Sequence, residues 1–233
     1  MKTVFPIKNK LILFSLCGLC CLYFIFTVFS CGLDTFYFLE PPTTSVIRIP
    51  SSDPVEKFFQ FTTSSNLENA SIFTGTSVYY RLYNSLSLLT QDVNNISNRN
   101  EIYSDKAMNY MISNGFQTLM VGDSDFIVPA SDGVANVTIR PFADTGYPAS
   151  VSINNKYIGI PYRYQVETPF TFYPENENIP IPESGDLDTK YSSNGGNTWY
   201  LVAYAVSIGS NMELLPVFSQ VTYLGYLSIS PTY

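Results

Sequence analysis

The sequence predicts a mainly β protein folded as a sandwich or barrel, and three observations support this fold class. Its 233 residues include 18 Tyr and 17 Phe, together with many Val, Ile and Thr, which are the residues enriched in strands. Short runs of alternating apolar and polar residues recur along the chain, separated by turn signals. Two segments alone have the apolar spacing of a helix. The length suffices for one large or two small domains, each with a core.

The first 30 residues differ in kind from the rest of the chain. Residues 1–10 carry three Lys and no acidic residue, and residues 11–30 carry no charge. A basic start followed by an apolar run is the pattern of a secretory signal peptide. About twenty apolar residues also suffice to cross a bilayer as a helix. A cleaved signal peptide over residues 1–30 is therefore predicted, with a retained membrane anchor and soluble secretion as the alternatives.

Cys31 favours cleavage. Val28, Phe29 and Ser30 precede it, and this junction resembles the lipobox of bacterial lipoproteins, in which a signal peptidase cuts before a cysteine that then carries a diacylglycerol. Phe29 replaces the small residue usual at its place, as in the relaxed boxes of spirochaetes. The resemblance implies that residues 1–30 are a lipoprotein signal peptide and that Cys31 is acylated, for example with palmitate. Acyl chains would hold the protein on a membrane without crossing it.

The cysteine count agrees with this interpretation. The three other cysteines all lie in the apolar run, so cleavage before Cys31 removes them. The exported domain would then contain no disulfide, although its compartment would allow one.

The mature chain is expected to begin with a lipidated tether over residues 31–54, in which Pro41 and Pro42 block helix formation. An elaborated β-sandwich domain then fills residues 55–233. The turn sequences at 131–133 and 153–155 supply Asn, Asp or Gly where positive φ is needed, so each is predicted to close a hairpin. Strands are predicted at 58–62, 76–83, 116–121, 125–129, 135–141, 149–153, 157–164, 170–173, 199–208 and 217–229.

Two segments interrupt the strand pattern. Apolar residues recur at helical spacing over residues 86–96, and Ser104 is predicted to be the N-cap of a second helix that ends before Gly115. Both helices follow the strand predicted at 76–83, and they are expected to be an insertion laid over one edge of the sandwich, where they would cover unpaired backbone groups. The inward residues predicted for the second helix are Met108, Met111 and Ile112.

Three segments resemble strands of a fibronectin type III domain. Residues 73–84, FTGTSVYYRLYN, are similar to its central strand, residues 199–207, WYLVAYAVS, to its sixth strand, and residues 219–229, SQVTYLGYLSI, are placed as its last strand would be. The resemblance implies an immunoglobulin or fibronectin type III-like sandwich with a helical insertion. CGLD followed by YFLEPP also resembles uncharacterised treponemal lipoproteins. The residues predicted to share one face of the sixth strand are Trp199, Leu201, Ala203 and Ala205.

Charge and composition limit the function. Three of the twelve Lys and Arg residues and none of the nineteen Asp and Glu residues precede Cys31, which leaves a net charge of −10 that repels nucleic acid. The chain contains no His, so Ser/His/Asp and Cys/His nucleophile systems are excluded. We therefore expect that the protein is not an enzyme and that it binds no cofactor. A His-independent hydrolase such as a glycosidase, which needs two carboxylates, is the distant alternative.

One long polar loop, residues 174–198, holds the candidate site. A loop of this length is uncommon in a compact domain unless it is functional or disordered. Its carboxylates would favour a cationic partner or Ca²⁺, but the spacing of an EF-hand loop is absent, so a solvated acidic loop without a ligand is the simpler alternative. The weak metal candidates are Glu183, Asp186 and Asp188, and the candidate binding residues are Trp199, Glu175 and Glu177.

The expected function is that of a lipid-anchored bacterial envelope protein, on the cell membrane or the outer membrane and facing the periplasm or the cell exterior. A non-catalytic binding or adhesion module for a protein or glycan partner fits the tether and the sandwich. The many tyrosines of the predicted strands are either exposed recognition anchors or, in the simpler alternative, ordinary core and rim of the sandwich. The alternative, from another functional class, is a structural envelope protein without a specific ligand.

Overall fold

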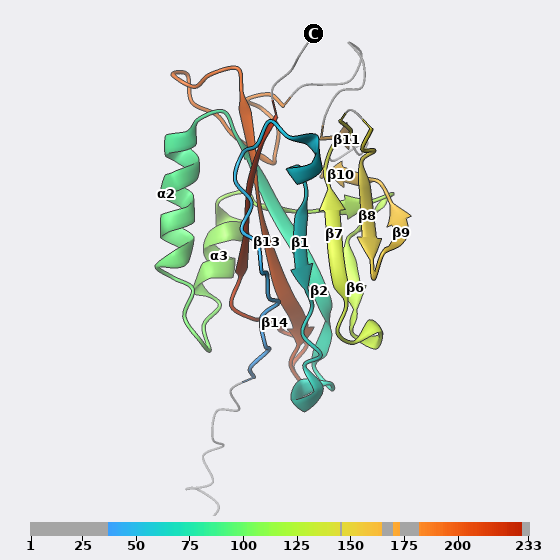
Figure 1. The fold of residues 1–233 in the computed structure, drawn as a ribbon. Helices are drawn as coiled ribbons and strands as arrows, with labels where there is room; N and C mark the ends of the chain where they lie inside the picture. Colours follow the sequence, from blue (N-terminus) through green and yellow to red (C-terminus); the bar gives the residue numbers. More distant parts are fainter. Residues whose placement is uncertain (1–36, 145, 165–169, 173–181, 230–233) are drawn as a thin grey trace, which may run out of the picture. The chain divides into compact units, whose positions relative to one another are not determined.

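The computed structural model describes residues 37–144, 146–164, 170–172 and 182–229 (Figure 1). These residues belong to one compact unit, Tyr37–Tyr233, and the unit Met1–Phe36 lies outside the described residues. The predicted signal peptide and the acylation predicted at Cys31 therefore lie outside the described residues.

The described chain is mainly β, as predicted, and its strands form sheets of four, four and seven members. In the seven-stranded sheet β2 and β13 pair along almost their whole lengths, and β13 also pairs with β15. All pairs in this sheet are antiparallel except β12 with β2. Its strands are β2 (Phe73–Tyr83), β3 (Gln117–Thr118), β6 (Ile127–Pro129), β12 (Thr189–Lys190), β13 (Trp199–Ser210), β14 (Pro216–Phe218) and β15 (Thr222–Ile229).

The two smaller sheets are antiparallel throughout. The first has the order β1-β7-β8-β9, with β1 (Phe59–Thr62), β7 (Asn136–Arg140), β8 (Ser150–Ile153) and β9 (Lys156–Gly159). The second has the order β11-β10-β4-β5, with β11 (Phe170–Thr171), β10 (Pro161–Arg163), β4 (Met120–Val121) and β5 (Ser124–Asp125).

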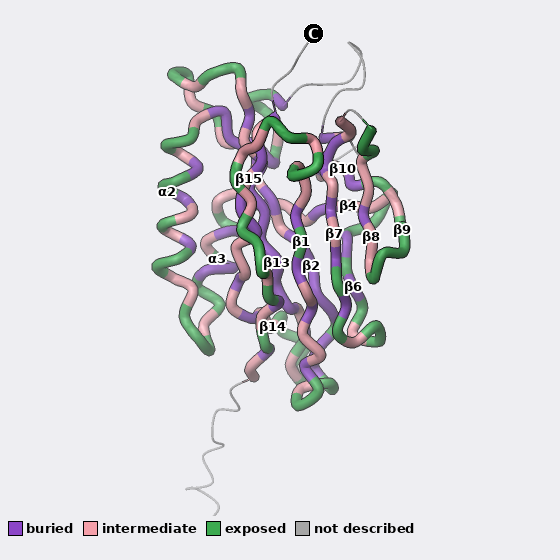
Figure 2. Tube along the Cα trace, viewed as in Figure 1, coloured by how far each residue is buried: buried purple, intermediate pink, exposed green. Residues whose placement is uncertain are grey.

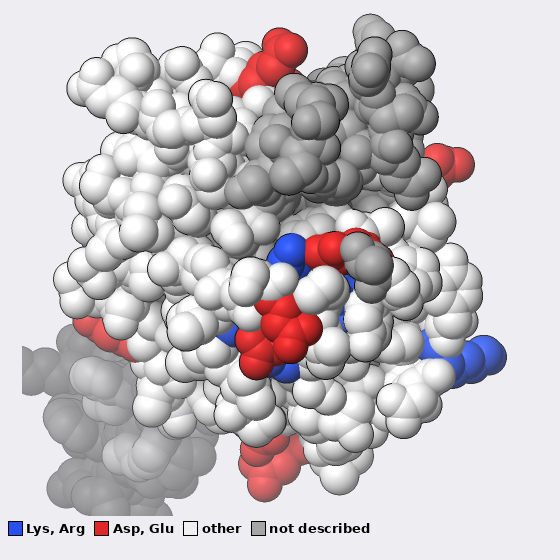
Figure 3. Space-filling model, turned by 45° about the horizontal axis from the view of Figure 1, so that its top comes forward, with Lys and Arg blue, Asp and Glu red and all other residues white. Residues whose placement is uncertain are grey.

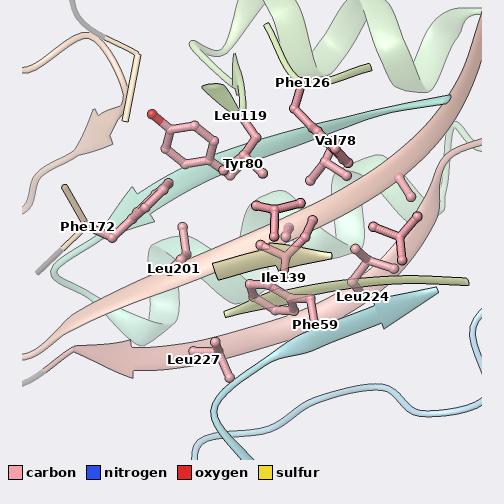
Figure 4. Packing of buried hydrophobic residues seen from close by; sticks show 14 of the residues in the cluster. Phe59, Val78, Tyr80, Leu119, Phe126, Ile139, Phe172, Leu201, Leu224 and Leu227 are labelled. Atoms are coloured by element: carbon pink, nitrogen blue, oxygen red, sulfur yellow. The ribbon is translucent and has the colours of Figure 1, made fainter. Parts of the chain in front are cut away.

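Strand β13 is buried on both faces over most of its length, and this stretch is purple in Figure 2. One face packs in a core cluster with residues of β1 and β7, and Figure 4 shows Leu201 lying with Phe59 and Ile139 in that cluster. The predicted common face of Trp199, Leu201, Ala203 and Ala205 is confirmed, because all four belong to this cluster. The residues of the other face, which belong to a second cluster, are Val202, Tyr204 and Val206.

Two helices, α2 (Leu86–Ser97) and α3 (Lys106–Ser113), complete the second cluster. They lie over a face of the seven-stranded sheet (Figure 1), so their predicted position over a sheet edge is wrong. The reason is that their apolar sides need an apolar surface to cover, and alternate residues of β13 provide one. Met108 and Met111 point inward as predicted, whereas Ile112 is 50% exposed.

The two predicted hairpin turns have different outcomes. Asn154 and Asn155 have φ values of 50° and 64° and join the paired strands β8 and β9, which confirms the hairpin there. Gly133 also has positive φ, at 62°. However, β6 before it pairs with β2, and β7 after it pairs with β1 and β8. The turn at 131–133 therefore carries the chain from one sheet to another, and the predicted hairpin is wrong.

The folded domain begins earlier than the expected boundary at residue 55. Leu39 is completely buried, and Thr43 exchanges two backbone hydrogen bonds with Thr62. Arg48 N donates to Leu224 O at 3.0 Å, and Arg48 O accepts from Tyr226 N at 3.0 Å. A Cβ built on the intervening Gly225, whose φ is +105°, would lie 2.0 Å from Arg48 O, so this contact requires glycine. The second half of the predicted tether is thus part of the domain.

Candidate functional site

Two clusters of buried charged side chains lie at the C-terminal end of β2. The first surrounds Arg163, the last residue of β10, whose side chain is completely buried. Its Nε and Nη2 donate to Asp188 at 2.9 and 2.7 Å, and Nη2 also donates to Asp186 at 2.6 Å. Tyr80 of β2 donates its hydroxyl hydrogen to Asp188 at 2.8 Å and accepts from Tyr164 N at 2.6 Å. One guanidinium and one phenol therefore hold both carboxylates.

Burial and charge determine the protonation states of this Arg163 cluster. Burial by itself lowers the pKa of Arg163, but the hydrogen bonds and charges of Asp188 and Asp186 outweigh it and raise that pKa above its ordinary value. Burial, followed by the charge of Asp188, raises the pKa of Tyr80 well above its ordinary value. At neutral pH Arg163 is therefore a permanent cation and Tyr80 a permanent hydrogen-bond donor. A general base would instead need a pKa near the working pH.

The second cluster surrounds Asp92 of α2, which is 1% exposed. The hydroxyls of Tyr83 and Tyr110 each donate to its carboxylate at 2.8 Å, and Lys190 Nζ lies 2.9 Å from both carboxylate oxygens. Arg81 Nη1 lies 3.9 Å from Asp92 Oδ2. Burial and the charge of Asp92 raise the pKa of Tyr83 above its ordinary value, so this phenol remains a donor. Cations and donors thus surround Asp92 and compensate its buried charge.

Strand β12 connects the two clusters. It pairs in parallel with the last residues of β2, so that Thr189 faces Leu82 and Lys190 faces Tyr83. Asp188, directly before β12, reaches the Arg163 cluster, and Lys190 reaches Asp92 of α2 on the other face of the sheet. One short strand is therefore fastened to both faces of the seven-stranded sheet.

Asn84, just after β2, fastens the following part of the chain. Its Oδ1 accepts from Ser192 N at 2.7 Å, and its Nδ2 donates to Ser192 O at 2.9 Å. A Cβ on Gly195 would lie 2.3 Å from Asn84 Nδ2, so glycine allows this close approach. Together with β12, these contacts fasten residues 182–198, which we name the recognition segment, to the end of β2.

The residues predicted as weak metal ligands make other contacts in the structure. The positive charge near Asp186 and Asp188 is the guanidinium of Arg163, which occupies the place that a bound cation would have. Glu183 is exposed, and its backbone N–H donates to Asp186 Oδ2 at 3.0 Å. Within the described ranges, no group of three or more His, Cys, Asp and Glu residues is placed to hold a metal ion.

Of the candidate binding residues, Trp199 is 6% exposed and belongs to the core cluster of β13. Its ring centroid lies 6.5 Å from that of Tyr191, which is 52% exposed. The indole is therefore a core group, and Tyr191 is the aromatic ring that the recognition segment presents to solvent. The candidates that lie outside the described residues are Glu175, Glu177 and the lipidation candidate Cys31.

The sequence analysis did not predict the central residues of the two clusters, Asp92 and Arg163, although each has a recognisable sequence signal. Asp92 lies three residues after Leu89 and four before Ile96, so it occupies the inward side of an amphipathic helix. Arg163 lies between two tyrosines in a predicted strand. A charged residue at an inward position indicates a buried ion pair, but its partner is distant in sequence and cannot be identified locally.

The described residues in view at this end include few charged side chains. Figure 3 shows the molecule with the upper end of Figure 1 brought forward, and charged side chains form small groups on a mainly uncharged surface. This fits the overall composition, in which charged residues make up 13% of the chain.

Comparisons with protein families, with curated proteins and with solved structures found no match. Among the described residues, no helix has both the length and the apolar character needed to cross a membrane.

Proposed function

We propose that this chain is a lipid-anchored protein of a bacterial cell envelope that acts as a non-catalytic binding or adhesion module. The observation that carries the proposal is the short distance along the chain between Cys31 and the folded domain. Tyr37, six positions after Cys31, already packs against buried residues of the domain. An acylated Cys31 would hold the domain directly at a membrane surface. The alternative of an uncleaved helix over residues 11–30 would hold it at the same place.

The buried clusters support a role without catalysis. A glycosidase needs two carboxylates that face the substrate from opposite sides of its scissile bond. The close pair Asp186 and Asp188 instead shares Arg163, and Asp92 is surrounded by Lys190 and two phenols. These carboxylates are engaged within the fold, which favours a binding or structural protein over a His-independent hydrolase.

The recognition segment is the part of the domain best suited to a partner. It lies at the C-terminal end of β2, and Tyr37 lies at the N-terminal end with Phe73. Eleven residues of β2 span roughly 35 Å, so the segment lies well away from Tyr37. Loops at one end of a rigid scaffold commonly carry recognition, and an exposed Tyr such as Tyr191 is a rigid anchor with a polar tip. A protein or a glycan fits such an anchor.

We further infer an elaborated sandwich related to the immunoglobulin and fibronectin type III folds. Strands β2, β13 and β15 are adjacent and antiparallel, in the order of strands C, F and G of that architecture. The sheet β1-β7-β8-β9 departs from the ABED order, because β7, β8 and β9 follow one another outward from β1. The elaboration therefore extends beyond the helices.

The anchor is tested with a Cys31→Ala variant of the full chain expressed in a bacterium that acylates lipoproteins. We expect the variant to lose labelling by radioactive palmitate and to keep its N-terminal 30 residues, which increases its mass. Unchanged labelling and unchanged mass would overturn the lipid anchor.

The binding site is tested by pull-down with envelope proteins and by a glycan array. The parent chain is compared with Tyr191→Ala and with a matched control, Tyr157→Ala, because Tyr157 is 60% exposed on β9 in another sheet. We expect a partner that the parent and the control retain and that Tyr191→Ala loses. Equal capture by the parent chain and both variants would place the site elsewhere. The absence of any partner would favour the structural envelope protein.

A further inference from the structure

The end of the domain opposite the recognition segment exposes apolar side chains on three turns. Met212 and Leu214, between β13 and β14, are 89% and 85% exposed, and Leu215 is 54% exposed. Leu67, in the short 3-10 turn before β2, is 80% exposed, and Val134, after β6, is 60% exposed. Single exposed apolar residues are common on protein surfaces, whereas several on neighbouring turns mark an interaction site.

Contacts inside the domain bring these turns together. Ser210, at the base of the β13–β14 turn, donates its N–H to Ile72 O at 2.9 Å, and Ile72 N donates to Asn69 O in the turn that contains Leu67. Figure 1 shows the start of the described chain and the junction of β13 and β14 at the same lower end. A small buried cluster lies there, formed by Leu39, Ile72 and Phe73, with Tyr37, Ala130 and Val217 packed against it.

The β13–β14 turn is held in one conformation by its own hydrogen bonds. Asn211 Oδ1 accepts from the backbone N–H groups of Glu213 and Leu215, each at 2.9 Å, and Asn211 N donates to Leu215 O at 3.0 Å. Leu214 has a φ of 62°, in a region that bulky residues rarely adopt. The turn is therefore built to display its apolar side chains to the outside.

We propose that this apolar end docks onto the lipid bilayer that holds the N-terminal segment. Tyr37 packs against the small cluster behind the three turns, and the uncharged run over residues 11–30 ends shortly before it. The five residues 32–36 span at most about 18 Å when extended, so the bilayer lies within reach of the turns. This holds for an acylated Cys31 and for an uncleaved helix, and the inference rests on the proposed membrane location.

The acidic residues on these turns indicate which kind of lipid the apolar end would contact. Glu68, Asp132 and Glu213 are exposed on them. The turn residues 67–69, 130–134 and 211–215 contain no Lys or Arg. Exposed carboxylates are repelled by an anionic membrane, whereas a basic protein surface would be attracted to it. Apolar contact with a zwitterionic bilayer is therefore the interaction that fits, and insertion would reach the boundary between headgroups and acyl chains.

The single tryptophan provides the experiment. Trp199 is buried at the opposite end of the domain and serves as an internal reference. The full chain carrying Met212→Trp is reconstituted in phosphatidylcholine vesicles with and without brominated acyl chains, which quench a nearby indole. We expect the added emission to shift to shorter wavelength and to be mostly lost in brominated vesicles. The matched control Leu187→Trp, at a 48% exposed position of the recognition segment, is expected to keep its emission.

The outcomes separate this inference from the proposed function. If the chain does not float with vesicles, the membrane location fails and the docking fails with it. If the chain floats but Met212→Trp and a second variant, Leu67→Trp, both keep their emission, the docking alone is overturned. A wavelength shift without lipid that grows with protein concentration would assign the apolar end to a second copy of this chain and would also overturn it. Replacing phosphatidylcholine by phosphatidylglycerol is expected to weaken the quenching, and stronger quenching would contradict the lipid preference.

Discussion

At the N-terminal end of β2 apolar side chains are exposed, whereas at its C-terminal end charged side chains are buried. Met212 and Leu214 are almost fully in contact with solvent, while Arg163, Asp188 and Asp92 are removed from it. The difference teaches that charge pairing fastens residues 182–198 at one end, whereas the other end leaves apolar side chains uncovered, which in our proposal meet a lipid surface.

The energetic terms at the two ends differ as well. Burying a charge costs several kcal/mol per ion unless partners compensate it. The Arg163 and Asp92 clusters supply those partners from strands, a helix and the recognition segment, so any break in them is expected to be costly. The apolar turns make no such contacts, so changes there are expected to affect membrane contact and leave folding unchanged.

The largest effect is expected for Asp188→Leu, which leaves Arg163 buried with only part of its compensation. Removing one partner of a buried ion pair costs about 3–5 kcal/mol. The free energy of unfolding, measured by denaturant titration, should fall by this amount. In the double variant Arg163→Met with Asp188→Leu the loss should be much smaller, because no unpaired charge remains. Equal losses in the single and double variants would contradict the role of Arg163.

A smaller loss is expected for Tyr83→Phe. This change removes a donor from the buried carboxylate of Asp92, and a hydrogen bond to a charged group contributes about 1.5–3 kcal/mol. Tyr157→Phe, at an exposed position, is the matched control and should change the unfolding free energy by less than about 0.5 kcal/mol. Similar values for the two variants would mean that the cluster does not stabilise the fold.

Alkaline pH is expected to lower the free energy of unfolding gradually. Burial raises the pKa of Tyr80, Tyr83 and Tyr204 above the ordinary value of 10.0, so these phenols keep their protons in the folded state when the unfolded chain loses them. Their contribution is complete below pH 10 and is lost as the pH rises above it, by up to about 1.4 kcal/mol per pH unit for each tyrosine. Unfolding free energies at pH 8 to 12, with tyrosinate absorbance, measure this. Stability that is constant above pH 10 would contradict the burial of these groups.

The smallest effect on folding is expected at the apolar end. The double variant Met212→Ser with Leu214→Asn should change the unfolding free energy by less than about 0.5 kcal/mol, because both side chains are exposed and Asn tolerates positive φ. Hydrogen exchange of the turn amides in phosphatidylcholine vesicles should nevertheless become faster than in the parent chain. A loss of stability as large as that of Asp188→Leu would show that the apolar turn belongs to the core and would remove the contrast between the ends.

Local patterns in the sequence determined the mainly β class, most strand positions, both helices and the hairpin at Asn154 and Asn155. These features depend on neighbours within a few positions, through side-chain alternation, helical spacing and turn chemistry. The one long strand predicted at 217–229 is instead two strands, β14 and β15, because the three residues 219–221 lie opposite only two residues of β13 and interrupt the regular pairing. Strand β12 was missed, since two residues that pair with β2 have no local period.

Only the tertiary structure decided which face each element covers and which charges meet. Arg163 and Asp188 are 25 positions apart, and Asp92 and Lys190 are 98 positions apart, so no local pattern links them. The same holds for the turns that contain Leu67 and Met212, which become neighbours only through the pairing of β2 with β13. Alternation and spacing act within one segment, whereas burial and charge pairing depend on contacts between segments, and the sequence alone does not contain those contacts in readable form.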